Sequence, residues 1–119
     1  MAIIEACGQG HHRVVKRLLQ DPRVDPSTDN NMALFFATFI PGKKRERALI
    51  VEMLLKDPRV DPSAEHSRAL RLASQNGNVE IVSMFLRDNR VQDRQSALVE
   101  ARKNGYPVIE DMILKSINS

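Results

Sequence analysis

DPRVDPS stands at residues 21–27 and returns unchanged at residues 57–63, 36 positions further along the chain. A seven-residue identity in a chain of 119 residues is not a chance event, and its flanks repeat as well. Each copy follows two apolar pairs, which are Val14-Val15 and Leu18-Leu19, then Ile50-Val51 and Leu54-Leu55. A period between about 20 and 50 residues indicates a protein of stacked repeats.

Four repeats, within a single domain, follow from aligning these flanks. They cover about residues 1–26, 27–62, 63–93 and 94–119. The repeats share a first segment in which two alanines stand four residues apart, as in Ala33 and Ala37. Three of them carry a glycine four residues after the second alanine, at Gly10, Gly77 and Gly105. Such a glycine is typical of the end of a helix.

Two short helices are therefore expected in each repeat. The alanine stripe of the first helix permits close packing against a neighbour. The second helix is amphipathic, with Val79, Val82, Phe85 and Leu86 as the predicted apolar stripe of the third repeat. Asp-Pro ends it, because proline lacks an N–H and favours extended geometry before it. We expect Asp21 and Asp57 to accept hydrogen bonds in the turn, and the loop valines to be buried (Val24, Val60 and Val91).

The pattern resembles ankyrin repeats over essentially the whole chain, through Ala-Leu-x-x-Ala-x-x-x-Gly and the apolar pairs of residues 10–19 and 77–86. The resemblance implies an all-α, helix-turn-helix repeat solenoid of about 3.5 to 4 units, with hairpin-like loops and a concave face. It also implies a role in protein–protein interaction. The family's Thr-Pro-Leu-His tetrapeptide is replaced at residues 32–35, 68–71 and 96–99, and residues 40–47 contain an insertion of about five residues. The loop before the fourth repeat is three residues shorter than the others, so we expect a stunted hairpin there.

The first repeat has apolar residues at its outer end, whereas the fourth repeat has polar ones. Glu110 stands where other repeats carry Val15, Val51 and Val82, which is typical of a polar C-terminal cap. Ile3 and Ile4 look able to pack on something further, so the N-terminal boundary is either a cut through a longer array or the start of a short protein.

Composition narrows the setting of the protein. With 18 Lys and Arg against 15 Asp and Glu, the formal net charge is only +3, and both signs are interspersed. The single cysteine, Cys7, excludes an intrachain disulfide and favours a reducing compartment. No apolar run is long enough for a membrane span, and no signal peptide is recognisable. We expect a monomer in the cytoplasm, with the nucleus as the open alternative.

No residue pattern predicts catalysis, a metal or a cofactor. Cys7 lacks a base held by an orienting group and is expected to be a small buried residue. His11 and His12 border a turn, and His66 lies two repeats away, so a set of metal ligands is not expected. The basic cluster Lys43, Lys44, Arg45 and Arg47 is interpreted as a solvated loop insertion.

A protein partner is the predicted ligand, bound by the loops and by the exposed side of the first helices. Exposed phenylalanines there would serve as anchors, although they equally could fill space left by the missing proline and histidine. The residues chosen are Asn30, Asn31, Phe36, Phe39, Glu65, His66, Arg68, Leu72, Gln75, Gln95, Glu100 and Lys103. Two alternatives stay open. One is a structural spacer from a longer array, and the other, which the charge disfavours, is a nucleic-acid or anionic-surface binder using residues 43–47 with Arg68, Arg71, Arg87, Arg90 and Arg94.

Overall fold

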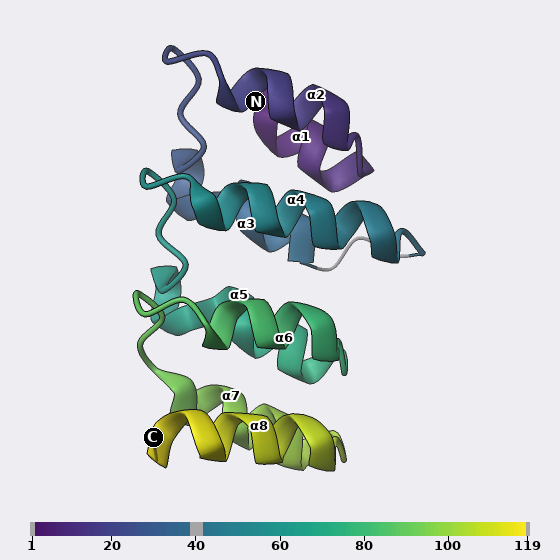
Figure 1. Ribbon diagram of the computed structural model, residues 1–119, viewed down its shortest axis with the longest axis vertical. Coiled ribbons are helices and arrows are strands. Elements are labelled where there is room, and N and C mark those ends of the chain that lie inside the picture. Colours follow the sequence, from purple (N-terminus) through teal and green to yellow (C-terminus); the bar gives the residue numbers. More distant parts are fainter. Residues whose placement is uncertain (1, 39–41, 119) are drawn as a thin grey trace. The chain divides into compact units, whose positions relative to one another are not determined.

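The computed structural model describes residues 2–38 and 42–118, and in these ranges the chain is all-helical, with eight helices and no strand. The helices form successive pairs, and a short turn joins the two helices of three of them: α1 to α2, α5 to α6, and α7 to α8 (Figure 1). Their bounds are α1 (Ala2–Gln9), α2 (His12–Leu19), α3 (Thr28–Thr38), α4 (Lys44–Lys56), α5 (Ala64–Gln75), α6 (Val79–Leu86), α7 (Arg94–Lys103) and α8 (Pro107–Asn118). The prediction of an all-α fold is confirmed over these residues.

Two compact halves make up the chain, Met1–Asp61 and Pro62–Ser119. In the N-terminal half, α1 packs against α2 and α3, while α4 packs against α2 and α3. In the C-terminal half, α5 packs against α6 and α7, and α8 packs against α6 and α7. Each half thus contains two predicted repeats, and the division lies within a residue of the predicted boundary at Pro62.

Left-handed glycines end the first helix of three pairs, as predicted. Gly10, Gly77 and Gly105 have φ angles of 75°, 72° and 75°. At Gly77 the need is also steric, because a Cβ atom there would lie 2.6 Å from ring atoms of Tyr106. Only glycine satisfies both the backbone angle and this close approach.

The core confirms most of the predicted apolar positions and corrects the predictions for Val79 and for Ile3 and Ile4. Leu34, Ala37, Val82 and Phe85 are buried, but Val79 is largely exposed because it opens α6 and Ile81 takes the inward position. Ile3 and Ile4 are both buried, so they are not available for further packing as the sequence had suggested.

The basic insertion is also different from its prediction as a loop. Lys44, Arg45 and Arg47 lie in the first turn of α4, which has 13 residues where α2 and α6 have eight. Lys43 precedes that turn and donates from Nζ to the Gln9 carbonyl, 2.9 Å away. A cation at the end of α1 is favoured by the unsatisfied carbonyls and the helix dipole. Residues 39–41 of the predicted insertion lie outside the described residues.

The aspartates after the second helices perform the predicted turn role. Oδ1 of Asp21, Asp57 and Asp88 accepts the backbone N–H two residues later at 2.9, 3.0 and 2.9 Å. Each carboxylate is also paired with an arginine side chain, at 2.8, 2.8 and 2.7 Å. Val60 and Val91 are buried in these loops and Val24 is half-buried, so the valine prediction holds fully for two of the three.

Asp88 makes the stability of the C-terminal half sensitive to acid. Hydrogen bonds from the Arg90 side chain, and secondarily from its backbone N–H, lower the pKa of Asp88 below its ordinary value. A carboxyl with a lowered folded-state pKa stabilises fully above its unfolded pKa, near 3.9. That contribution is lost as pH falls through the folded-state pKa.

We therefore expect Asp88→Asn to flatten the acid limb of the stability curve. Urea unfolding measured at intervals below about pH 5 should show a shallower fall for the variant than for the natural chain. Parallel curves for the two proteins would contradict this assignment of Asp88.

Candidate binding surface

Two left-handed turns are the least expected feature of the backbone. Residues 29–31 at the start of α3 have φ angles of 55°, 57° and 63°, and residues 65–67 at the start of α5 have 52°, 57° and 56°. None of the six is glycine, and this conformation costs about 1–2 kcal/mol per residue for ordinary L-amino acids. Backbone strain of this kind clusters at functional sites. The turns contain four of the predicted partner-binding residues: Asn30, Asn31, Glu65 and His66.

Different side chains hold the two turns. In the first, Oδ1 of Asn31 accepts the backbone N–H of Asp61 at 2.8 Å. In the second, Arg71 donates to the carbonyls of Glu65 and His66 at 2.9 and 3.2 Å. Ser67 occupies the place of Asn31 in the second turn, where its buried hydroxyl has no hydrogen-bond partner among the described residues.

The hydrogen bond of Asn31 bears on its predicted role in partner binding. Its side chain is buried and bonded inside the N-terminal half, so the expectation that it contacts a partner does not fit the structure. Asn30, Glu65 and His66 are exposed and remain candidates. In each turn the third residue, Asn31 or Ser67, is buried, and the residue before it faces solvent.

Phe36 is the aromatic candidate on α3. It is 36% exposed, whereas the adjacent Phe35 is buried. One edge of its ring lies close to α1, since a Cβ atom on Gly8 would be 3.3 Å from Cδ2 of Phe36. Phe36 is therefore partly packed against α1 and partly exposed to solvent. Phe39, its predicted companion, lies outside the described residues.

The remaining candidates belong to α5 and α7, which pack against each other. Residues 68, 72 and 75 follow helical spacing along α5, and residues 100 and 103 hold the matching positions on α7. Gln75, Gln95 and Lys103 are exposed, and Arg68, Leu72 and Glu100 are half-buried. Arg68 lies 3.6 Å from Glu65, a solvated ion pair that contributes little to stability. The candidates in the C-terminal half are thus polar except for Leu72, and the exposed Val99 lies between Gln95 and Lys103 on α7.

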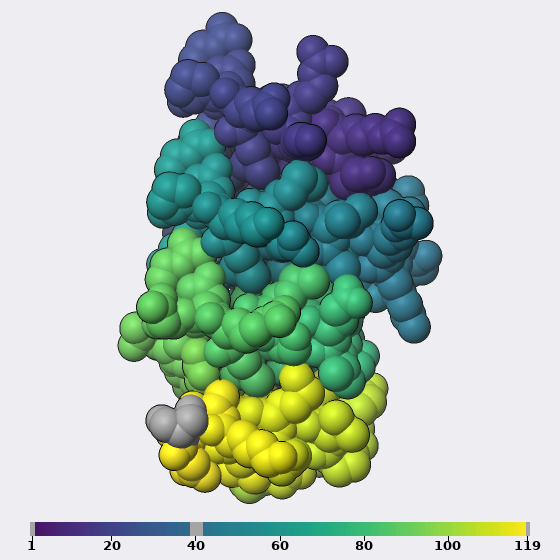
Figure 2. Space-filling view, viewed as in Figure 1, coloured from purple at the N-terminus to yellow at the C-terminus, as the bar shows by residue number. Residues whose placement is uncertain are grey.

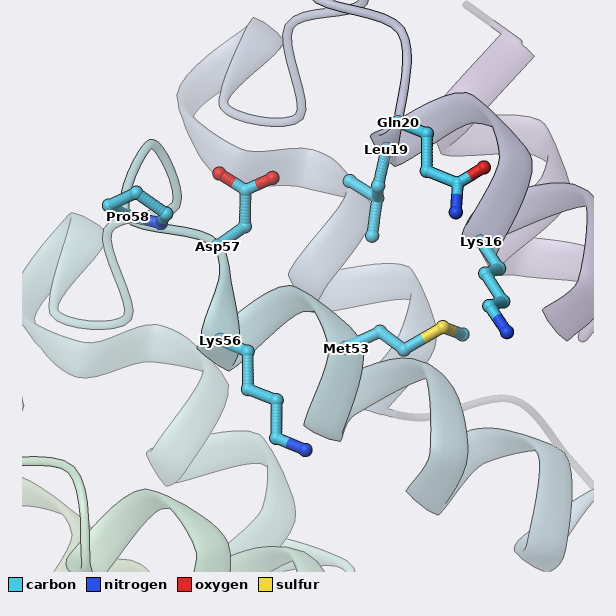
Figure 3. A pocket seen from close by; sticks show the side chains of 7 residues that line it. All are labelled: Lys16, Leu19, Gln20, Met53, Lys56, Asp57 and Pro58. Carbon is cyan, nitrogen blue, oxygen red and sulfur yellow. The ribbon is translucent and has the colours of Figure 1, made fainter.

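The sequence did not suggest a hollow of about 350 Å³ between α2 and α4. Leu19 and Met53 extend into this space, and Lys16 and Lys56 reach its rim (Figure 3). The remaining lining residues are Gln20, Asp57 and Pro58. In the sequence, Leu19 is recognisable only as a member of an apolar pair, which gives no sign of a cavity.

The side chains that could react or bind a metal do not gather into a site. Cys7 is fully buried, and burial raises the pKa of its thiol to about 12, which disfavours the nucleophilic thiolate. In residues 2–38 and 42–118, no three His, Cys, Asp or Glu side chains gather as metal ligands would. The three histidines are not brought together into such a site.

Several arginines named for the anionic alternative have partners inside the fold. Arg71 holds the second left-handed turn, Arg90 pairs with Asp88, and Arg94 donates to the Asp88 carbonyl at 3.3 Å. Using them to bind phosphate would mean breaking these contacts. Lys44, Arg45 and Arg87 are exposed.

The class defined by fold and surface is an all-helical protein of paired short helices. In three comparisons, no family model, no curated protein and no solved structure matches the chain. Of the helices that the structure describes, none combines the length and apolar character needed to cross a bilayer.

Proposed function

We propose that this chain is an ankyrin-type repeat protein that binds a protein partner without catalysis, through its left-handed turns and the exposed side of its first helices. The observation that carries the proposal is the pair of turns at residues 29–31 and 65–67. Each is strained, recurs with the 36-residue period and presents polar side chains to solvent. Such a turn is costly to maintain as a mere connection, and α7 begins without one.

The binding surface in each half follows from burial. In the N-terminal half it comprises Asn30 and Phe36. In the C-terminal half it comprises Glu65, His66, Arg68, Leu72, Gln75, Gln95, Glu100 and Lys103. Half-exposed aromatic side chains on a rigid helix are typical binding anchors, since they bury much area at little entropic cost. Phe36 is therefore the side chain whose removal should weaken binding most.

Leu49 on α4 provides a matched control for Phe36. It is an apolar side chain of nearly equal exposure (38% against 36%) in the same half, but on a second helix. Affinity capture with the natural chain, Phe36→Ala and Leu49→Ala as baits, followed by titration of the recovered protein, separates the two surfaces. Phe36→Ala should weaken binding about tenfold or more, the loss expected at a hot spot, and Leu49→Ala should leave it unchanged. Equal affinity for all three baits would show that Phe36 is not a binding anchor.

The alternatives give different outcomes in the same experiment. An anionic ligand would bind to all three baits equally, and its binding to a random DNA duplex would fall steeply with salt. A structural spacer would recover no protein at all. Arg71, Arg90 and Arg94 already have partners inside the fold, which argues against the anionic-ligand alternative.

A further inference from the structure

The second repeat shows how a helix pair of this protein receives the pair before it. In α4, Ile50 and Leu54 are completely buried, and α4 packs against α2. Arg59, in the loop after α4, donates from Nη1 to the Val24 carbonyl at 2.6 Å and from Nη2 to the Leu19 carbonyl at 3.3 Å. Leu19 ends α2, where helix carbonyls lack internal partners and the dipole attracts cations.

The same positions in the first repeat are uncovered. Val14 matches Ile50 but is 49% exposed, and Leu18 matches the buried Leu54 but is only half-buried. The Arg23 side chain matches that of Arg59 and is 88% exposed, against 36%. Figure 2 shows the α2 segment at the surface of the N-terminal half.

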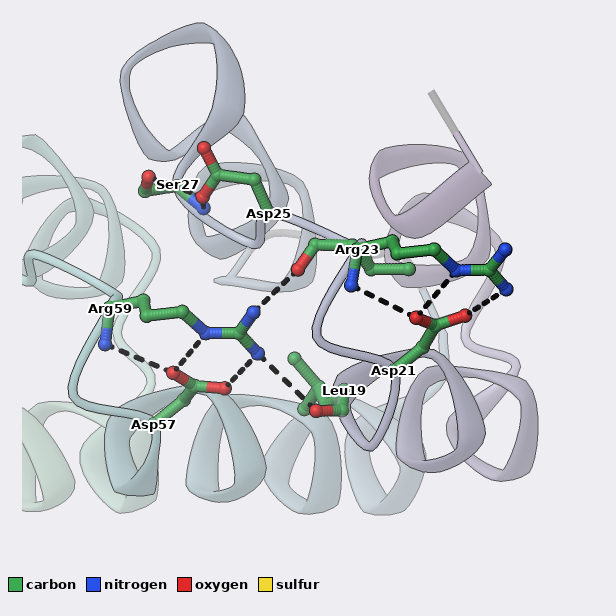
Figure 4. Close-up of polar contacts among 8 residues, drawn as sticks. Leu19, Asp21, Arg23, Asp25, Ser27, Asp57 and Arg59 are labelled. Carbon is green, nitrogen blue, oxygen red and sulfur yellow. Dashed lines mark hydrogen bonds and ion pairs between the residues drawn. The ribbon is translucent and has the colours of Figure 1, made fainter.

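Arg23 is nevertheless held as Arg59 is held. Its Nε and Nη2 donate to Asp21 at 3.1 and 2.8 Å, and those of Arg59 donate to Asp57 at 3.0 and 2.8 Å. Within the described residues, Nη1 of Arg23 has no hydrogen-bond partner, and among the residues drawn in Figure 4 the guanidinium is bonded only to Asp21. The donor that reaches a neighbouring carbonyl in the second repeat is therefore already oriented in the first.

We propose that Val14, Leu18 and Arg23 form a docking surface for a further helix pair of this same repeat type, one that ends in a D-P-x-V-D loop. Such a partner supplies an apolar face for the two aliphatic side chains. Its helix-end and loop carbonyls accept from Arg23, as those of Leu19 and Val24 accept from Arg59. The α8 end of a second copy fits poorly as the partner. Its Glu110 stands where the other second helices carry Val15, Val51 and Val82, and it is paired with Arg102 at 2.8 Å.

An extended chain tests the proposal directly. A copy of residues 32–67, one full period of 36 residues, is placed ahead of Met1 so that the register of the alanine helices is kept. Arg23→Ala and Val14→Lys are then made in both the natural and the extended chain. Both side chains are exposed in the natural chain, so the variants should fold and melt within a degree or two of it. In the extended chain, each should lower the melting temperature by several degrees.

Val108→Lys on α8 is the matched control for Val14→Lys, since Val108 is similarly exposed and lies in the other half. It should have the same small effect in both chains. Equal effects of Arg23→Ala and Val14→Lys with and without the added repeat would overturn the proposal. So would dimerisation of the natural chain that either variant abolishes, because a second copy would then be the occupant. The readout is stability, so it is independent of the binding experiment on Phe36.

Discussion

Arg59→Ala should lower the melting temperature of the protein more than any other exposed polar substitution. The side chain bonds to the Asp57 carboxylate and to two backbone carbonyls, those of Leu19 and Val24, which lie in the preceding repeat. Removing it leaves a carboxylate that is only 11% exposed without its counterion, and two carbonyls without a donor. Thermal unfolding followed by circular dichroism gives the measurement.

Arg23→Ala is the control, because the same residue stands in the same heptapeptide with the same aspartate pair. It lacks the contact to a preceding repeat, so it should shift the midpoint much less than Arg59→Ala. Arg59→Lys refines the test, since an ammonium group keeps the charge but cannot bond in two directions as the planar guanidinium does. Equal midpoints for the Arg23 and Arg59 alanine variants would show that the carbonyl contacts contribute nothing.

Ala73→Leu should lower the free energy of unfolding by about 1–3 kcal/mol, the usual cost of overpacking a filled core. Ala69 and Ala73 are completely buried on α5, which packs against α6 and α7. An isobutyl group at either position has no space unless the helices separate or adopt strained rotamers. Urea denaturation with an unchanged m-value is the expected signature.

Gln75→Leu separates size from hydrophobicity. It introduces the same side chain two residues further along α5, at an exposed position. We expect a change within about 0.5 kcal/mol, as for most surface substitutions. An Ala73→Leu variant as stable as Gln75→Leu would mean that the alanine spacing does not set the distance between the helices.

The sequence predicted the parts of this fold that obey local rules. Glycines at a fixed offset, Asp-Pro stops and apolar pairs each have a direct backbone or packing cause, so helix ends and most buried positions followed from them. The turns at residues 29–31 and 65–67 did not, because Asp, Asn and His favour left-handed geometry only weakly, and Glu65 and Ser67 do not favour it. What holds those turns is long-range, such as the 2.8 Å bond from the Asp61 N–H to Asn31.

Surface prediction failed in a related way. Asn31 looked like a polar loop residue free to bind a partner, yet its amide is buried because it bonds to a loop 30 residues away. The basic insertion looked like a loop because it interrupts the repeat, yet helix-compatible Lys, Arg and Glu residues extend α4 instead. Both predictions relied on residue type alone, whereas the contacts made in the folded chain determine where these residues lie.

The reach of Arg59 back to Leu19 and Val24 has a consequence for biosynthesis. The acceptor carbonyls leave the ribosome some 35 to 40 residues before the donor does, as the sequence separations of these two bonds require. The carbonyls of Leu19 and Val24 can therefore accept from Arg59 only after the second helix pair has been synthesised. On the ribosome, we expect protection of the Leu19 helix end against proteolysis to begin only once residue 59 has cleared the exit tunnel.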